Sequence, residues 1–244
     1  MGNLAAFTTV THFPLRSIST IDPGRVLIVA PHPDDETLGC GGAIALLRSH
    51  HYPVQVLVVS DGTMSHPRSR KFPAPILRQL REQETIDALR ILGVESSDIK
   101  FLRLPDSLIE EHIDSAIAQV SNYLRSTVPT TIFLPWRCDP HPDHRATWQL
   151  FDQAIRSLSF SPRIIEYPIW DWDPEQRGTV ATTAKVMGWR LDIAEIGKLK
   201  QNAIAQYRSQ TTNLIDDDLE GFRLTAELLE NFAHPWELFF EEIR

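Results

Sequence analysis

The sequence is poor in cysteine, in long hydrophobic runs and in positive charge. It has two cysteines in 244 residues, too few for a disulfide scaffold, and we expect Cys40 and Cys138 to pack as small buried side chains. No apolar run reaches the length of about 18 residues that a membrane-spanning helix needs, so we expect no span. The 24 basic residues face 32 acidic ones, a net charge of -8, which argues against a nucleic acid as partner.

The first residues, MGNLAAFTTV, also lack the charged start and long apolar segment of a secretory signal peptide. We therefore expect a cytoplasmic protein. The length and an ordinary hydrophobic content predict one large globular domain with a sizeable core.

Short apolar runs alternate with amphipathic patterns through the first two-thirds of the chain. The apolar runs predict buried strands at residues 26–30, 54–60, 99–104, 130–136 and 163–170. The amphipathic patterns predict helices at residues 43–51, 76–92, 113–124 and 147–158. Strict alternation is typical of parallel strands with helices on both faces, so we predict an α/β, Rossmann-like three-layer fold with a mostly parallel sheet.

The last third has a different pattern and predicts an appended C-terminal α+β portion. Its segments predict one or two strands at 182–193, helices at 196–207 and 219–232, and a closing strand at 236–243. The acidic run at 216–220 predicts a solvated helix start with Asp218 as N-cap. We interpret residues 1–244 as a single domain, with a core at about 24–170 and an extension at about 171–244.

Two dense polar clusters follow the first and the fourth predicted strands. VLIVAPHPDDE places His32, Asp34 and Asp35 after the first strand. RCDPHPDHR places Asp139, His141, Asp143 and His144 after the fourth. In the common strand order 3-2-1-4-5 these two strands are neighbours, and the loops at their carboxyl ends border the ligand crevice. The topology therefore predicts that the two clusters meet in space.

A shared divalent metal would explain why so many charged groups gather there. Buried carboxylates and imidazoles are costly unless they are paired or bind a metal. Two histidines, His32 and His144, and one aspartate would leave a coordination position open, as catalytic zinc sites do. Zn²⁺ suits this set, and Fe²⁺ is the alternative. The other carboxylate of the Asp34–Asp35 pair could then take a proton from the attacking water.

Other hypotheses start from the same or neighbouring residues. LGCGGAI (38–44) departs from the dinucleotide fingerprint G-x-G-x-x-G at its last glycine, and the acidic run before it would repel a pyrophosphate. Cys138 and His141 could belong to a structural zinc site. A sugar- or nucleotide-binding module without catalysis would need no base beside the metal, so Asp34→Asn would leave its affinity nearly unchanged.

Several further residues have two interpretations each. Arg81 and Glu84 could form an i, i+3 surface pair, or Arg81 could contact substrate. The basic residues within 68–71 predict a solvated loop that borders the substrate entrance, with contact to an anionic group as the alternative. Trp136 and Trp170 predict core or rim packing, with an aromatic platform for a sugar ring as the alternative.

The two clusters together resemble the LmbE-like, or PIG-L-type, zinc-dependent deacetylases. PHPDDE and HPDH in this order carry the resemblance, and SDGTMSHP (60–67), REQETIDALRILGV (81–94), FLRLPD (101–106) and KQNAIAQYRSQ (200–210) agree with it. It covers roughly residues 26–210. It implies a hydrolase that removes an N-acetyl group from an N-acetylglucosamine-type sugar or glycoconjugate, with another N-acylated natural product as the alternative substrate. Members are often oligomers, so a homo-oligomer is also expected.

The resemblance also implies a role for each matching residue. The metal ligands would be His32, Asp35 and His144. The general base would be Asp34. The oxyanion would be stabilised by His141, which Asp143 orients. Substrate would contact Arg81 and Asp106.

Overall fold

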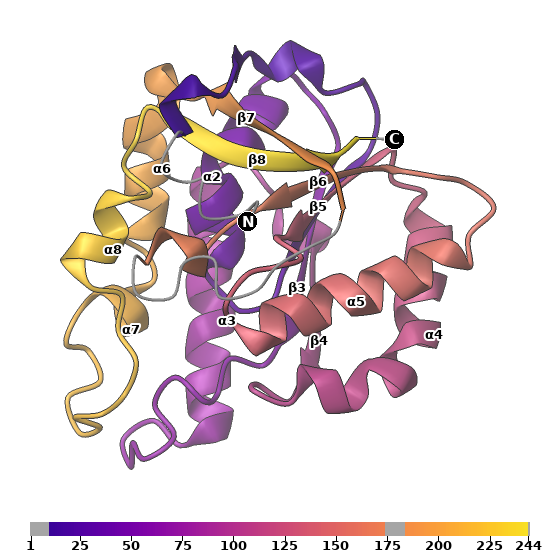
Figure 1. The fold of residues 1–244 in the computed structure, drawn as a ribbon. Helices are drawn as coiled ribbons and strands as arrows, with labels where there is room; N and C mark the ends of the chain where they lie inside the picture. The colour runs from indigo at the N-terminus through magenta and orange to yellow at the C-terminus, as the bar shows by residue number, and fades with distance from the viewer. Residues whose placement is uncertain (1–9, 174–183, 244) are drawn as a thin grey trace.

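The computed structural model describes residues 10–173 and 184–243, and a single mixed sheet organises them (Figure 1). The strands are β1 (Leu15–Arg16), β2 (Val26–Ala30), β3 (Val54–Ser60), β4 (Ile99–Leu104), β5 (Thr131–Pro135), β6 (Arg163–Tyr167), β7 (Val186–Asp192) and β8 (Trp236–Glu242). They lie in the order β1-β7-β8-β6-β5-β2-β3-β4. The stretch from β4 to β6 is the predicted 3-2-1-4-5 order, and its strands are parallel.

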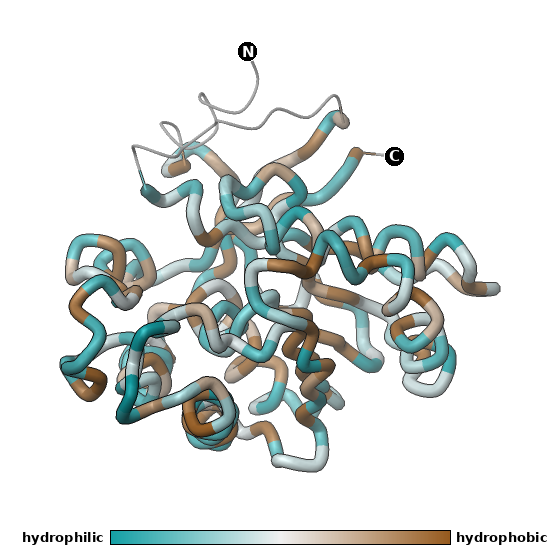
Figure 2. The backbone as a smooth tube through the Cα atoms, turned by 90° about the horizontal axis from the view of Figure 1, so that it is seen from below, coloured by the Kyte–Doolittle hydropathy of each residue, from teal (hydrophilic) through white to brown (hydrophobic). Residues whose placement is uncertain are grey.

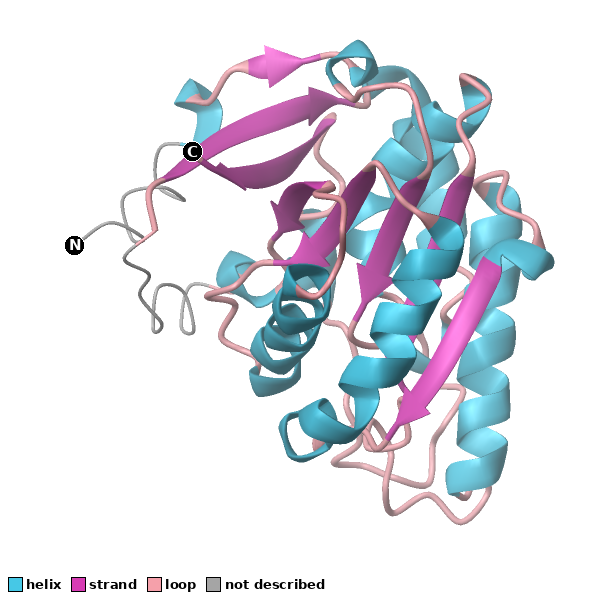
Figure 3. Ribbon diagram, turned by 90° about the vertical axis from the view of Figure 1, so that its right-hand side faces the viewer, coloured by secondary structure: helices cyan, strands magenta, loops and turns pink. Residues whose placement is uncertain are grey.

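Helices cover both faces of this sheet (Figure 3). The helices are α2 (Asp35–Ser49), α3 (Ala74–Ile91), α4 (Ile109–Thr127), α5 (Pro142–Arg156), α6 (Gly197–Ile204), α7 (Arg208–Thr211) and α8 (Ala226–Glu230). Short 3-10 turns are η1 (Val10–His12), η2 (Ile18–Thr20), η3 (Ser96–Asp98), η4 (Trp170–Trp172) and η5 (Ala194–Ile196). None of the helices in the described ranges is long and apolar enough to cross a membrane.

Alternate side chains of the central strands pack into two separate hydrophobic cores, one on each face of the sheet. In β2, Val26, Ile28 and Ala30 join the core beneath α2 and α3, whereas Leu27 and Val29 join the core beneath α4 and α5. Because both faces of β2 are covered, all five of its residues are buried, which explains its unbroken apolar sequence. Hydrophobic stretches accordingly gather toward the middle of the molecule in Figure 2. The Rossmann-like α/β prediction is confirmed.

Helix α2 begins eight residues earlier than the sequence pattern predicts, at Asp35 rather than Ala43. The three glycines of LGCGGAI lower helix propensity and conceal its first two turns. They permit close packing instead. A Cβ atom at Gly39 would lie 2.2 Å from Cδ2 of Tyr167 on β6. The early start places Asp35 in the first helical turn and not in an extended loop.

The C-terminal third continues the same sheet, with three corrections to the prediction. Residues 236–242 form β8, but this strand lies between β6 and β7 and is antiparallel to both, so it does not close an edge. The predicted helix at 219–232 shrinks to α8, and the one at 196–207 to α6. A single strand, β7, lies within 182–193, and residues 182–183 fall outside the described part. Residues 216–220 form no helix start.

Candidate active site

The turn between β2 and α2 contains an aspartate with a strained backbone conformation. Asp34 stands immediately before the helix with a φ of +130°, which side chains other than glycine rarely adopt. Arg81, on α3, holds the turn: its Nη2 atom donates to the carbonyl oxygen of Pro33 at 2.6 Å and to Asp34 Oδ2 at 3.1 Å. Backbone strain of this kind is maintained at sites where it serves a function.

The two sequence clusters meet at Asp35. Its Oδ2 atom is 3.1 Å from His32 Nδ1 and 3.2 Å from His144 Nε2. His144 is fully buried, and its Nδ1 atom lies 3.4 Å from Oδ1 of Asp139. Neither nitrogen of His144 is aligned for a hydrogen bond with its carboxylate. Buried ring nitrogens that are close to carboxylates yet lack aligned hydrogen bonds suit a metal ion.

The other nitrogen of His32 faces two more carboxylates. His32 Nε2 lies 3.2 Å from Asp143 Oδ2 and 3.3 Å from Asp106 Oδ1. Backbone N–H groups hold both carboxylates, from Ser107 to Asp143 at 2.7 Å and from Met64 to Asp106 at 2.8 Å. The loops after β3 and β4 therefore contribute to the same site as those after β2 and β5.

His141 caps the N-terminus of α5. Its Nδ1 atom accepts a hydrogen bond from the backbone N–H of Asp143 at 3.2 Å. The family resemblance suggests that the Asp143 carboxylate orients this ring, but in the structure that carboxylate contacts His32 and the backbone contacts the ring. Because Nδ1 accepts, the hydrogen of the neutral imidazole must lie on Nε2.

The surface-pair hypothesis for Arg81 and Glu84 is wrong, since their exposed fractions are 3% and 5%. Glu84 accepts hydrogen bonds from the backbone N–H and the Oγ atom of Ser209, at 2.8 and 2.6 Å. Arg81 Nη1 donates to the carbonyl oxygen of Gly62 at 2.9 Å. Arg81 thus ties together the loops after β2 and β3, and it lines the cavity described below.

Burial and mutual contact shift the acidities in this cluster in opposite directions. Burial raises the pKa of Asp34 to about 8, although Arg81 opposes the shift. Burial alone would lower the pKa of His144, but Asp35 and Asp139 raise it to about 9. Burial, reinforced by His32 and His144, lowers the pKa of His141 to about 3. The cluster therefore contains a carboxyl that can exchange a proton near neutral pH beside a neutral imidazole, which suits acid–base chemistry.

Several residues of this cluster line a cavity of about 480 Å³, here called the strand-end pocket. Its lining comprises His32, Asp34, Asp35, Leu38, Met64, Ser65, Arg81, Asp106, Ser107, His141, Ile169, Trp170, Phe222 and Leu224. Among the described residues, two groups have ligand atoms close enough together as they stand to hold a metal ion: His32 with His141 and His144, or His32 with Asp106 and Asp143. Asp35, whose carboxylate contacts both His32 and His144, adds a carboxylate ligand to two histidines of the first group. Neither group includes a cysteine, and Cys138 is buried, so the structural Cys/His zinc hypothesis has no support.

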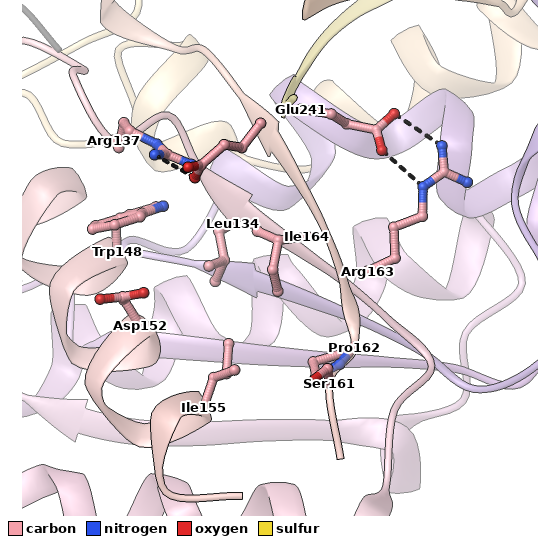
Figure 4. A pocket seen from close by; sticks show the side chains of 11 residues that line it. Leu134, Arg137, Trp148, Asp152, Ile155, Ser161, Pro162, Arg163, Ile164 and Glu241 are labelled. Carbon is pink, nitrogen blue, oxygen red and sulfur yellow. Dashed lines mark hydrogen bonds and ion pairs between the residues drawn. The ribbon is translucent and has the colours of Figure 1, made fainter. Parts of the chain in front are cut away.

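A second cavity, of about 430 Å³, lies between α5 and the β6–β8 side of the sheet, and is here called the α5 pocket (Figure 4). Trp148, Asp152 and Ile155 of α5 form one wall. Arg137 and Arg163 stand at its two ends, and both are paired with glutamates. It has an apolar floor and no group with catalytic geometry, so we place the chemistry in the strand-end pocket.

The structure adds supporting residues that the sequence patterns did not assign. Asp139 accepts from the backbone N–H groups of His141, Ile169 and Trp170, at 3.0 Å each, besides facing His144. Glu36 accepts a hydrogen bond from the Tyr207 hydroxyl. The PHPDDE and QYRSQ motifs contain Glu36 and Tyr207, but their pairing depends on a contact between α2 and the segment after α6 that no local pattern reveals.

A mostly parallel α/β sheet whose strand ends meet in a pocket of histidines and carboxylates with a potential metal site suits metal-assisted hydrolysis. The chain matches the PIG-L family model, described as GlcNAc-PI de-N-acetylase, over residues 27–155. It therefore belongs to the PIG-L, or LmbE-like, family, and a deacetylase function is supported.

Individual relatives agree with this family. The chain is 30% identical over 225 residues to the probable N-acetyl-α-D-glucosaminyl L-malate deacetylase 2 of Bacillus subtilis, covering 89% of this chain and 94% of that protein. It is 27% identical over 198 residues to the diacetylchitobiose deacetylase of Thermococcus kodakarensis, covering 78% and 71%. The fold also resembles the 4-carboxy-2-hydroxymuconate hydratase of Pseudomonas putida, with a TM-score of 0.68, 17% identity, and 91% and 96% coverage. The reaction must thus be argued from the site.

Proposed function

We propose that this protein is a metal-dependent N-deacetylase acting on an N-acetylglucosamine-type sugar or glycoconjugate, with His32, Asp35 and His144 as the ligands of a zinc ion. The single observation that carries this proposal is the position of the Asp35 carboxylate between His32 and His144. A set of two imidazoles and one carboxylate suits Zn²⁺, with Fe²⁺ as the alternative, and leaves room for water and substrate.

The alternative group of His32, Asp106 and Asp143 is a weaker ligand set. Backbone N–H groups already bind both of its aspartates. His144, in contrast, is buried without an aligned hydrogen bond and gains most from a metal. In this proposal Asp106 and Asp143 orient His32 through its Nε2 atom, as carboxylates commonly orient histidine ligands.

The bound zinc would polarise the acetyl carbonyl and lower the pKa of water at the site. Asp34 is the base that accepts the proton of the attacking water, and its raised pKa lets it return that proton to the leaving amine. Arg81 fixes the Asp34 side chain through Oδ2 and the turn through Pro33. His141 donates from Nε2 to the developing oxyanion, because its Nδ1 atom is engaged by the start of α5.

The metal assignment is tested by elemental analysis of the purified protein and four variants. We expect about one zinc or iron ion per chain, lost in Asp35→Ala and in His144→Ala. The control is His50→Ala, an exposed histidine just after the far end of α2, which should retain the ion. Retention of the ion in both site variants, with loss in Asp106→Asn, would transfer the site to the alternative group.

The reaction is tested by acetate release from N-acetylglucosamine conjugates. The wild type should release acetate in step with free amine, and Asp34→Asn should keep its metal but lose turnover. A protein that binds these sugars tightly without releasing acetate would be the non-catalytic module.

A further inference from the structure

One wall of the strand-end pocket is aromatic and leads away from the reacting groups. The Trp170 ring lies beside the His141 ring, with centroids 6.0 Å apart and planes at 26°. Phe222 continues the wall, 5.5 Å from Trp170 and edge-on at 62°. Phe222 is 36% exposed and Met64, also in the lining, is 49% exposed, so these two mark the mouth. The wall of Trp170, Phe222 and Met64 is here called the aromatic wall.

The loop that carries Phe222 is fastened to the loop between β3 and α3, beside which it lies in Figure 1. The backbone N–H of Phe222 donates to the carbonyl oxygen of Ser65 at 2.6 Å. Asp217 accepts from the Oγ atom of Ser69 at 2.7 Å and from the backbone N–H groups of Arg70 and Lys71 at 2.8 and 2.9 Å.

Two ion pairs, Arg68–Glu220 and Lys71–Asp216, join the same segments. The basic run is therefore paired with the acidic run and not simply solvated. The side chains of Arg68 and Lys71 are occupied by this contact, Arg70 joins it through its backbone N–H, and none of the three belongs to the lining of the pocket. These contacts hold the loop of Phe222 in place before substrate binds, which lowers the entropy cost of binding at the aromatic wall.

The charge of the pocket decides which groups this wall can accept. Among the described lining residues, Arg81 is the only lysine or arginine, and it stands beside Asp34 at the catalytic end. Both of its Nη atoms already donate to carbonyl oxygens or to Asp34. Among the described residues of the lining, a carboxylate on the group attached to the sugar would thus find no lysine or arginine beside the aromatic wall, and burying it there would be costly.

We propose, building on the deacetylase function above, that the aromatic wall binds the group attached to the N-acetylated sugar and selects an uncharged ring over an anionic substituent. The flat apolar face of a second sugar or of an aryl ring would pack on Phe222 and Trp170 while the acetamide reaches Asp34 and His141. The preferred substrate thus differs from the malate conjugate named for the Bacillus subtilis relative.

The test compares kcat/KM for acetate release from four substrates: free N-acetylglucosamine, N,N'-diacetylchitobiose, phenyl N-acetylglucosaminide and N-acetylglucosaminyl malate. Two of these substrates carry a second ring: N,N'-diacetylchitobiose and phenyl N-acetylglucosaminide. We expect kcat/KM for at least one of them to exceed that for free N-acetylglucosamine and for the malate conjugate by about tenfold or more. Phe222→Ala should remove about tenfold of this advantage, mainly by raising KM for the substrates that carry the second ring. Phe222→Tyr, which keeps the ring, should retain the advantage.

A matched control comes from the same loop. Leu219 is 89% exposed and lies outside the pocket lining, so Leu219→Ala should leave all four kcat/KM values unchanged. A malate conjugate that is the best substrate, or a Phe222→Ala variant that slows all substrates equally, would overturn the aromatic-wall proposal while leaving the deacetylase function intact. Absence of acetate release from every substrate would overturn the deacetylase function itself.

Discussion

The two pockets have similar volumes, about 480 and 430 Å³, but opposite electrostatic designs. In the α5 pocket both arginines are paired with glutamates: Arg137 contacts Glu166 and Glu242, and Arg163 contacts Glu241 at 2.8 Å. In the strand-end pocket, carboxylates from the three segments that follow β2, β4 and β5 surround imidazoles and Arg81. Charges balanced within the protein stabilise the fold, whereas an excess of negative charge creates a demand for a cation from outside.

The same Asp→Asn change in the two pockets should give the largest contrast. Asp34→Asn removes the proposed base, and we expect kcat to fall by about 10³-fold, within the range for loss of general base catalysis. Asp152→Asn, on α5 in the other pocket, should leave kcat within about twofold. Steady-state acetate release measures both, and metal content confirms that the Asp34→Asn variant is loaded with its ion.

The pH dependence of the free energy of unfolding should also differ between the wild type and the Asp34→Asn variant. Burial raises the pKa of Asp34 to about 8, so in chelated protein the folded state holds a proton that the unfolded chain releases above its ordinary pKa near 4. The wild type should therefore lose stability between about pH 4 and pH 8, and the variant should lose less. Urea unfolding at a series of pH values measures this dependence. If the free energy of unfolding falls equally steeply in both proteins, the proton does not belong to Asp34.

Removing one partner of the buried ion pair in the α5 pocket should act on stability and not on turnover. Glu166 is 1% exposed, and Arg137→Met would leave its carboxylate without its arginine partner. We expect a loss of about 3 kcal/mol in the free energy of unfolding, with kcat unchanged. Urea unfolding measures the loss, and the double variant Arg137→Met/Glu166→Leu should recover a large part of it. A drop in kcat without loss of stability would instead connect this pocket to the reaction.

Metal removal should have an intermediate effect on the free energy of unfolding. Chelation should abolish acetate release yet leave the chain folded, because His32 and His144 can pair with Asp35 without an ion. Adding back zinc at about 100 times its dissociation constant should restore activity and raise the free energy of unfolding by about 2.7 kcal/mol. Circular dichroism with and without chelator checks the fold, and unfolding on chelation would favour a structural metal instead.

The sequence predicts the central fold well because a strand that is buried on both faces must consist of consecutive apolar residues. The run at residues 26–30 has to be apolar throughout, and β2 appears with the predicted bounds. The convergence of His32 and His144 also follows from strand order alone. The pattern misses the first two turns of helix α2 because its glycines favour close packing over helix propensity: Gly39 lies against Tyr167 of β6, and Gly42 lies against Ile193.

Features that depend on long-range pairing could not be predicted from local patterns. The basic residues at 68–71 and the acidic run at 216–220 each look solvated, yet they bind one another across about 150 positions of sequence, as Arg68 and Asp218 do. Likewise, Arg81 and Glu84 have the spacing of a surface pair but face buried partners on different segments. For β8, the alternation predicted a strand but contained no information on its neighbours.

The smallest effect should come from the outer ion pair of the α5 pocket. Glu241 is partly exposed, as is Arg163, so water screens their bidentate contact more than it screens Arg137–Glu166. Glu241→Gln should therefore lower the free energy of unfolding by only about 0.5 kcal/mol, decrease that loss further in 1 M salt, and leave kcat unchanged. Urea unfolding at two salt concentrations measures both. A loss as large as that of Arg137→Met would mean that burial does not rank these pairs and that the two ends of the α5 pocket are equally desolvated.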